Sequence, residues 1–288
     1  MLRKLYLPKT RVAQLPSLDS KPHNHPVAAS TVYHRRIRRA EQLALQHPFA
    51  AEILGFYIHL AGFQRTLYER LEQASGSAPG LVESRFHGLL PGFQQFLSIV
   101  EEHGPSRVSS VAQRLHSLAS ESISDLLSAV WSGSNQAPST AEEFLAFAFL
   151  QPCAESARSR ARLQLENYTH PLCPFCSRKP AIAVLRPMGD GAQRKLVCGF
   201  CLTEWDFRRI VCPNCGEENH VKLPVYTAET LPHIRVECCD SCRVYIKSID
   251  LAKNGLADPL VDELASLPLD LWAQEHEYGK LRPNLLGM

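Results

Sequence analysis

The chain has 288 residues, 45% of them hydrophobic and 21% charged, and a formal net charge of +2. These values are typical of a globular protein with one large or two modest domains. No stretch approaches the ~20 consecutive apolar residues that a bilayer-spanning helix needs, so we expect no membrane span. The charge is uneven, because residues 1–47 hold nine basic residues against two acidic ones. The amino end, rather than the cysteine-rich part, is therefore the basic part of the chain.

The amino-terminal residues 1–30 are predicted to form an extended basic arm, because four prolines interrupt them. The arm is expected either to be disordered or to lie along the helical domain through its leucines. Two arginine pairs, at residues 35–36 and 38–39, superficially resemble a twin-arginine export signal. Polar residues follow where the apolar core of such a signal belongs, so we expect a cytoplasmic protein. We interpret the basic run as the solvated face of a helix over residues 31–46, with anion binding as the alternative.

Residues 31–168 are predicted to be an all-helical domain. Between residues 49 and 71, apolar residues recur every three or four positions, which predicts a long amphipathic helix. Further helices are predicted at residues 91–102, 108–119, 123–131 and 141–167, with a loop at 132–139. Thr140 and Glu143 are expected to form a capping box before the last helix, and Pro152 is expected to kink it. This domain has no phosphate loop, paired-carboxylate signature or zinc-protease motif, so we expect a scaffold or binding surface rather than an enzyme.

Four Cys-x-x-Cys pairs organise the next part of the chain. They are Cys173 with Cys176, Cys198 with Cys201, Cys212 with Cys215, and Cys239 with Cys242. Two intervening residues let both sulfurs of a pair point to one metal ion. The pairs follow one another at long, short and long separations, which groups the eight thiolates into two four-sulfur sites. We therefore predict two tandem rubredoxin-like or zinc-ribbon modules, at residues 169–210 and 211–250, each holding one mononuclear metal ion.

Disulfides and redox dithiols are the other interpretations of these cysteines. Disulfides are rare in a reducing cytosol, and no βαβ pattern surrounds any pair, as a redox dithiol would need. Tetrahedral thiolate suits both iron and zinc, so the spacing leaves the metal open. Cys153 is expected to be a small buried hydrophobic residue of its helix. Cys238 competes with Cys239 as a ligand, but the spacing to Cys242 favours Cys239.

Strands are predicted at residues 181–186, 194–197, 221–227 and 233–238, with a Gly-Asp-Gly turn joining the first two. Each module holds too little apolar material for a core of its own, so bound metal is expected to supply its stability. In the tail, residues 251–288, we predict helices over 258–264 and 269–276 that pack back on the body. The fold class is therefore α+β, with an N-terminal all-α domain, two four-cysteine modules and a short helical tail.

The cysteine-rich region and the tail carry the specific motifs of the chain. They are Cys173-Pro-Phe-Cys176, Cys198-Gly-Phe-Cys201-Leu-Thr-Glu-Trp205, Cys212-Pro-Asn-Cys215-Gly216, Cys239-Asp-Ser-Cys242-Arg-Val-Tyr245-Ile-Lys247 and Asp258-Pro-Leu-Val-Asp262. With these motifs the chain resembles the FdhE family, the formate dehydrogenase accessory proteins. One departure is Ser177, because such a turn usually carries glycine after its second cysteine, and a positive φ at this position would ask more of the backbone.

The resemblance implies a non-enzymatic, chaperone-like maturation factor of the cytoplasm, required to make respiratory formate dehydrogenase active. It implies contact with the catalytic subunit of that enzyme and favours iron in a rubredoxin-like setting, with zinc as the other possibility. A closed four-sulfur site agrees with such a role, because it leaves no coordination position for a substrate. Two alternatives stay open, a rubredoxin-like electron carrier and a nucleic-acid-binding ribbon protein. The weakly charged cysteine-rich region argues against the second, and the sequence leaves the oligomeric state undetermined.

Overall fold

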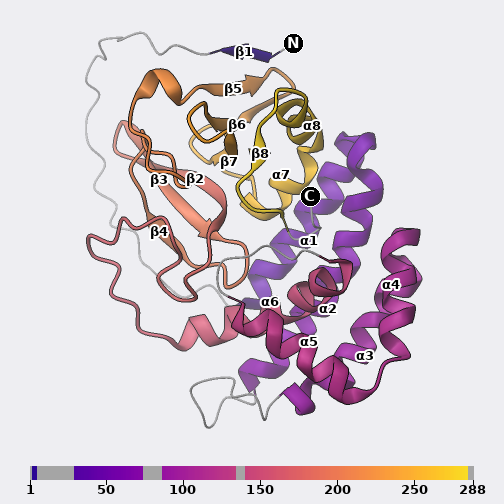
Figure 1. Cartoon of the computed structure of the whole chain (residues 1–288). Coiled ribbons are helices and arrows are strands. Elements are labelled where there is room, and N and C mark those ends of the chain that lie inside the picture. The colour runs from indigo at the N-terminus through magenta and orange to yellow at the C-terminus, as the bar shows by residue number, and fades with distance from the viewer. Residues whose placement is uncertain (1, 5–28, 74–85, 134–139, 285–288) are drawn as a thin grey trace.

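The computed structural model describes residues 2–4, 29–73, 86–133 and 140–284. A helical bundle and a mixed sheet lie side by side, and two short helices of the tail lie between them and against the sheet (Figure 1). The predicted amino-terminal arm falls largely outside the described residues, as does most of the predicted loop at 132–139. Among the described residues, no helix combines the length and apolar character needed to cross a bilayer.

The bundle consists of six α-helices and a single 3-10 turn among the described residues. They are α1 (Ala29–Gln46), η1 (Pro48–Ala50), α2 (Ala51–Gln73), α3 (Phe86–His103), α4 (Ser106–His116), α5 (Ser120–Ser132) and α6 (Ala141–Arg160). The capping box at the start of α6 is present, since Glu143 N donates to Thr140 Oγ1 and Thr140 N donates to the Glu143 carboxylate. The helix ends at Arg160 rather than at the predicted residue 167.

Helix α6 forms the centre of the bundle and is buried on every side from Phe144 to Ala154. A helix that is apolar all round packs against neighbours on all faces. Accordingly, α6 contacts α2, α4 and α5. The ring of Phe149 lies 5.0 Å from that of Phe93 on α3 and 6.1 Å from that of Phe63 on α2, measured between ring centroids. The predicted apolar stripe of α2 is largely buried, but Phe49, its first member, is 54% exposed because it lies in η1 rather than in the long helix.

The two predicted cysteine modules share one continuous sheet. Its strands are β1 (Leu2–Lys4), β2 (Pro180–Met188), β3 (Gly191–Cys198), β4 (Glu204–Asp206), β5 (Val225–Ala228), β6 (Leu231–Cys239), β7 (Val244–Asp250) and β8 (Gly279–Lys280). They follow the order β1-β5-β6-β7-β2-β3-β4, with β8 beside β7. The β2–β3 hairpin turns at Gly189, whose φ is +55°. Strands β2 and β7 pair in parallel, and this pairing joins the half that carries the first four cysteines to the half that carries the other four.

One predicted strand needs correction, and other strands of the sheet were not predicted. The predicted strand at 221–227 begins only at Val225, because the 3-10 turn η3 (His220–Lys222) occupies its first part. Strand β7 was not predicted, although it lies at the centre of the sheet. Strand β4 was not predicted either, because three residues are too few to show a pattern.

The tail helices α7 (Pro259–Ala265) and α8 (Leu267–Glu275) connect the bundle to the sheet. Helix α7 contacts α1 and α2 on one side and β2 and β7 on the other. One face of the sheet forms a separate apolar core with the tail, in which Ile182, Val184 and Ile249 pack with Leu269 and Ala273. The opposite face joins the core of the bundle through residues that alternate with these along the strands.

The basic run of α1 also needs correction, because only half of it is solvated. Arg35 and Arg38 are exposed, whereas Arg36 and Arg39 are each 7% exposed. Arg39 donates two hydrogen bonds to the carboxylate of Asp262 on α7, at 2.9 and 2.5 Å. The basic helix is therefore partly an internal surface that fixes the tail to the bundle.

Candidate metal centres

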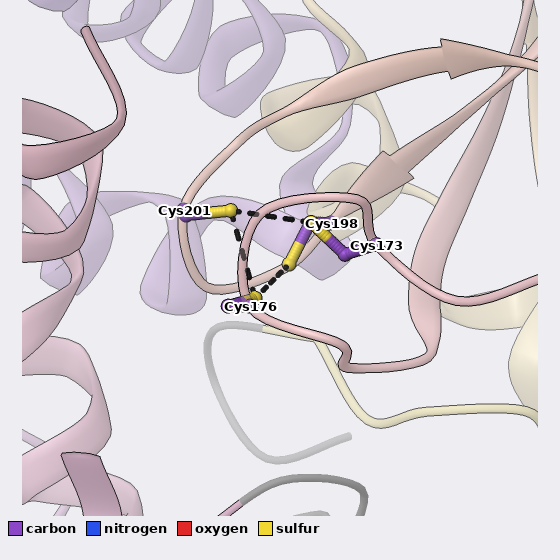
Figure 2. Close-up of side chains that lie close together, drawn as sticks. All are labelled: Cys173, Cys176, Cys198 and Cys201. Atoms are coloured by element: carbon purple, nitrogen blue, oxygen red, sulfur yellow. Dashed lines mark hydrogen bonds between the residues drawn. The ribbon is translucent and has the colours of Figure 1, made fainter. Parts of the chain in front are cut away.

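The structure brings the eight predicted cysteines together in two groups of four. Within each group, the four Sγ atoms lie within 4.8 Å of one another. The first group joins Cys173 and Cys176 to Cys198 and Cys201, and its sulfurs point toward one another (Figure 2). The second group joins Cys212 and Cys215 to Cys239 and Cys242.

The sulfur spacing fits a tetrahedral metal ion. Metal–sulfur bonds of 2.3 Å imply about 3.8 Å between the sulfurs of a regular tetrahedron. In the first group, the Sγ atoms of Cys173 and Cys201 lie 3.5 Å apart. The Sγ atom of Cys176 lies 3.4 Å from that of Cys198 and 3.7 Å from that of Cys201. In the second group, the Cys212–Cys242 and Cys215–Cys239 distances are both 3.7 Å. Four thiolates at these distances suit zinc or iron and do not distinguish between them.

Each pair sits in the same kind of backbone turn. The residue after the second cysteine has positive φ in all four: Ser177 (58°), Leu202 (56°), Gly216 (78°) and Arg243 (56°). In three of the turns, the amide of this residue donates to the carbonyl of the first cysteine, at 2.8–3.0 Å. The left-handed residue reverses the chain and leaves both sulfurs on the same side. The structure thus places Ser177 in the conformation that glycine adopts most easily.

Amide and hydroxyl groups lie beside the sulfurs. In the first group, Phe200 N donates to Cys198 Sγ at 3.4 Å, and the hydroxyl of Thr203 lies 3.1 Å from Cys201 Sγ. In the second group, Asn214 N donates to Cys212 Sγ at 3.4 Å. Hydrogen bonds of this kind stabilise the negative charge of a thiolate, as in other cysteine-bound metal sites.

The two groups differ in their surroundings. In the first, Cys173, Cys198 and Cys201 are buried and belong to the core that the sheet shares with the bundle. In the second, Cys215 is exposed and Cys242 is half-buried. The first group is therefore an internal site, and the second lies at the surface.

Aromatic and polar contacts dock the first group on the bundle. The ring of Phe200, between Cys198 and Cys201, lies 4.9 Å from that of Phe147 on α6 and 5.7 Å from that of Trp131 on α5. The guanidinium of Arg178 stacks 3.8 Å from the Phe200 centroid and donates to the carbonyls of Val130 and Trp131. Sequence reasoning missed Arg178, because nothing in its local pattern indicates partners 47 and 48 residues away.

The two cysteines outside the groups are buried. Cys153 is 2% exposed on α6, and burial raises the pKa of its thiol to about 12. Cys238 is 3% exposed and packs in the tail-side core of the sheet, where burial raises its pKa as well. Cys239, rather than Cys238, lies with the second group. Both remaining thiols therefore behave as small apolar residues.

Comparison with known proteins gives consistent matches. Residues 172–209 match the description "FdhE, central domain", and residues 210–286 match "FdhE, C-terminal domain". The chain is 30% identical to the Protein FdhE homolog of Aquifex aeolicus over 268 residues, which cover 87% of this chain and 94% of the relative. It is 29% identical to the Pseudomonas aeruginosa homolog, with 92% of each chain covered. The crystal structure of the FdhE protein from Pseudomonas aeruginosa superposes with a TM-score of 0.69 at 25% identity, covering 92% of this chain and 98% of that one.

Proposed function

The chain belongs to the FdhE family, whose members are formate dehydrogenase accessory proteins, and we propose that it acts as a maturation factor. In this role it contacts the catalytic subunit of a respiratory formate dehydrogenase in the cytoplasm and promotes its assembly or activation. The observation that supports this most directly is the pair of four-sulfur groups within a chain of this family. A closed four-sulfur group leaves no position for a substrate, which agrees with a role other than direct metal catalysis.

We assign one metal ion to each group. Cys173, Cys176, Cys198 and Cys201 hold the first ion, and Cys212, Cys215, Cys239 and Cys242 hold the second. The family resemblance favours iron, while four thiolates accept zinc equally well. Bound metal supplies folding energy to the turns, because it links four cysteines from separate loops to one ion. Elemental analysis of anaerobically purified protein is expected to give two equivalents of metal per chain.

The test of the maturation role is respiratory formate oxidation in a strain that lacks the gene. We expect the formate dehydrogenase polypeptide to be made at normal levels but to remain inactive. Restoring the gene should recover activity, whereas the purified protein alone should oxidise no formate. Unchanged formate oxidation in the deletion strain would contradict the proposal.

Electron transfer is a second candidate, and the exposure of the second group favours it. Cys215 is exposed, so an iron ion in that group lies close to solvent and within reach of a redox partner. A reversible one-electron couple in voltammetry of the iron-loaded protein, together with normal formate dehydrogenase activity in the deletion strain, would favour this role over maturation.

Nucleic-acid binding is the weaker alternative. Several basic side chains of the sheet region already form ion pairs, among them Arg186 with Glu204, Lys195 with Asp206, and Arg208 with Glu218. Binding to phosphates needs a surface with concentrated positive charge, and these ion pairs neutralise part of the positive charge of the sheet region. Steeply salt-dependent binding to DNA or RNA in a filter assay would revive this alternative.

A further inference from the structure

A cleft of about 690 Å³ lies beside the second four-cysteine group. Its floor consists of residues from β2, β3, β6 and β7, and its wall consists of the segments 209–214 and 220–225. Cys212 and Cys239 of the second group line one end of it. The volume falls in the range of ligand-binding clefts, and most of the lining is apolar, including Val211, Leu223, Val225, Val244 and Ile246.

Arginine side chains gather at the end of the cleft away from the cysteines. The strand register places these arginines at one end of the strands. Arg194 on β3 lies opposite Leu185 on β2, and Leu185 lies opposite Asp250 on β7. Asp250 binds the guanidinium of Arg235 at 2.5 Å. Cys239 lies opposite Val244, at the other end of the same strands. The cleft therefore has an arginine end and a cysteine end, with apolar walls between them.

The arginine end has hydrogen-bonding capacity left for an anion. Arg194 is 2% exposed and pairs with Glu237 at 2.7 Å, so its charge is already compensated and its guanidinium is closed to a ligand. Arg209 lines the cleft and is exposed; it donates to the carbonyl of Ala192 and forms no ion pair with a described residue. This end is therefore suited to a carboxylate.

The rim of the cleft carries two exposed apolar side chains. Ile210 is 57% exposed and Val221 is 60% exposed, and both line the opening. Exposed apolar side chains around a concave site are typical of protein-recognition surfaces. A small anion bound inside the cleft would leave both of them in water, whereas a polypeptide crossing the opening would cover them.

We propose that this cleft binds an extended segment of the client protein, with a bulky apolar side chain between the walls and a neighbouring Asp or Glu at the arginine end. The inference rests on the proposed maturation function, because it names the surface that recognises the catalytic subunit. Because Arg194 and Arg235 already pair with Glu237 and Asp250, Arg209 supplies the charge complementarity for the acidic residue, and the apolar lining and rim supply the buried area. The second metal centre fixes one end of the cleft, so its integrity and client binding are coupled.

The test compares four variants of the metal-loaded protein in binding to the purified catalytic subunit of formate dehydrogenase. Val221→Glu and Arg209→Glu alter the rim. Leu271→Glu is the control for the first, since Leu271 is 58% exposed on α8, and Arg70→Glu, exposed at the end of α2, is the control for the second. Because all four positions are exposed, we expect folding and metal content to stay unchanged. Each rim variant should weaken binding by about tenfold or more, and each control by less than about twofold.

Labelled overlapping peptides from the catalytic subunit, tested by fluorescence anisotropy, identify the segment. A peptide with an apolar residue next to an acidic one should bind the wild-type protein and the Leu271→Glu variant, but not Val221→Glu. Replacing its acidic residue with alanine should weaken binding to the wild type but strengthen binding to Arg209→Glu, because it removes the repulsion between two carboxylates.

Three outcomes would overturn the inference. If the catalytic subunit binds the wild type and both rim variants equally, the cleft is not the recognition surface, although the maturation role stands. If the catalytic subunit does not bind the wild type at all, the proposed function and the inference both fail. If the wild-type protein self-associates and the Val221→Glu variant does not, the rim belongs to a contact between two copies of this chain.

Discussion

Three of the four metal-binding turns hold a side chain where the backbone favours glycine. Ser177, Leu202 and Arg243 have φ values of 58°, 56° and 56°, and only Gly216 avoids the steric cost. The left-handed conformation costs an L-residue about 1–2 kcal/mol. A metal ion bound by the four sulfurs would fix each turn and so offset this cost. Under the proposed assignment, we therefore expect the loops to relax when metal is removed.

Substituting Ser177 tests this account. We expect Ser177→Gly to stabilise the metal-loaded protein by about 0.5–1 kcal/mol, because relief of the strain exceeds the extra backbone entropy that glycine loses on folding. Urea unfolding of the zinc-loaded protein measures the effect. The matched change, Gly216→Ser, should destabilise the protein by a similar amount. Equal stability of Ser177→Gly and wild type would show that the turn is not strained.

At the scale of elements, a buried charge cluster fixes the tail to the sheet. Lys247 on β7 is fully buried, and its Nζ lies 2.9 Å from Glu263 Oε1 on α7 and 2.6 Å from Asp270 Oδ2 on α8. Lys280, at the end of β8, lies 2.5 Å from Glu263 and 3.1 Å from Asp270. Tyr245 adds a hydrogen bond to Asp270 at 2.7 Å. Because the cluster contains two positive and two negative groups, removing one group leaves an uncompensated buried charge.

The pKa of Glu263 gives this cluster a pH dependence. Burial alone raises its pKa, but the ammonium groups of Lys247 and Lys280 outweigh burial and lower it from 4.5 to about 2. A carboxyl whose pKa is lower in the folded protein contributes stability above the unfolded pKa, and this stability is lost as the pH falls toward the folded pKa. The contribution is thus complete above about pH 5 and decreases from there to about pH 2.

Glu263→Gln is expected to lower the free energy of unfolding by about 3 kcal/mol at neutral pH, because it leaves a buried lysine without its partner. The difference from wild type should shrink as the pH falls below about 4.5, since the wild-type carboxylate then loses its advantage. Urea unfolding at pH 7, 4 and 3 measures both effects. The exposed Glu275→Gln on the same tail serves as the control. A difference from wild type that does not vary with pH would contradict the role of the ionised carboxylate.

The same strand shows why part of the fold escaped sequence analysis. Six of the seven residues of β7 are buried, including Lys247, Ser248 and Asp250. Strand prediction depends on alternation of apolar and polar residues, and polar residues buried on both faces remove that signal. Arg36 and Arg39 were wrongly predicted to be solvated for a related reason, because their partners Glu155 and Asp262 lie 119 and 223 residues away in sequence. By contrast, the capping box, the β2–β3 turn and the four cysteine turns depend on neighbours in sequence, and these were predicted.

For the whole molecule, the main consequence is the unequal docking of the two metal centres. The grouping of the eight cysteines followed from spacing, but the burial of the first group depends on Trp131 and Phe147, which no local pattern connects to it. The first group belongs to the core of the bundle, and the second lies at the edge of the cleft. Loss of metal from the first site should therefore destabilise the bundle as well as the local turns, whereas loss from the second site should affect only its surroundings.

Cys176→Ser and Cys215→Ser are each expected to lose one equivalent of metal. In Cys176→Ser, amide hydrogen exchange should also increase in α5 and α6, because Phe200 and Arg178 lose their fixed positions against those helices. In Cys215→Ser, exchange should increase only around residues 209–225 and the ends of β6 and β7. Elemental analysis and exchange mass spectrometry measure the two effects. Equal protection of α5 and α6 in both variants would show that the first centre does not stabilise the bundle.

The bond between Arg39 and Asp262 spans 223 residues of sequence, and this affects how the chain is made. On a ribosome, α1 leaves the exit tunnel long before α7 is synthesised. Arg39 therefore has no ion pair with Asp262 while most of the protein is being made. The central strand β7 also comes after both of the strands beside which it packs, β2 and β6. Contacts of such long range slow folding. The connection through α7 thus forms only near the end of translation, and a nascent chain stopped before residue 262 would expose the surfaces that α7 covers.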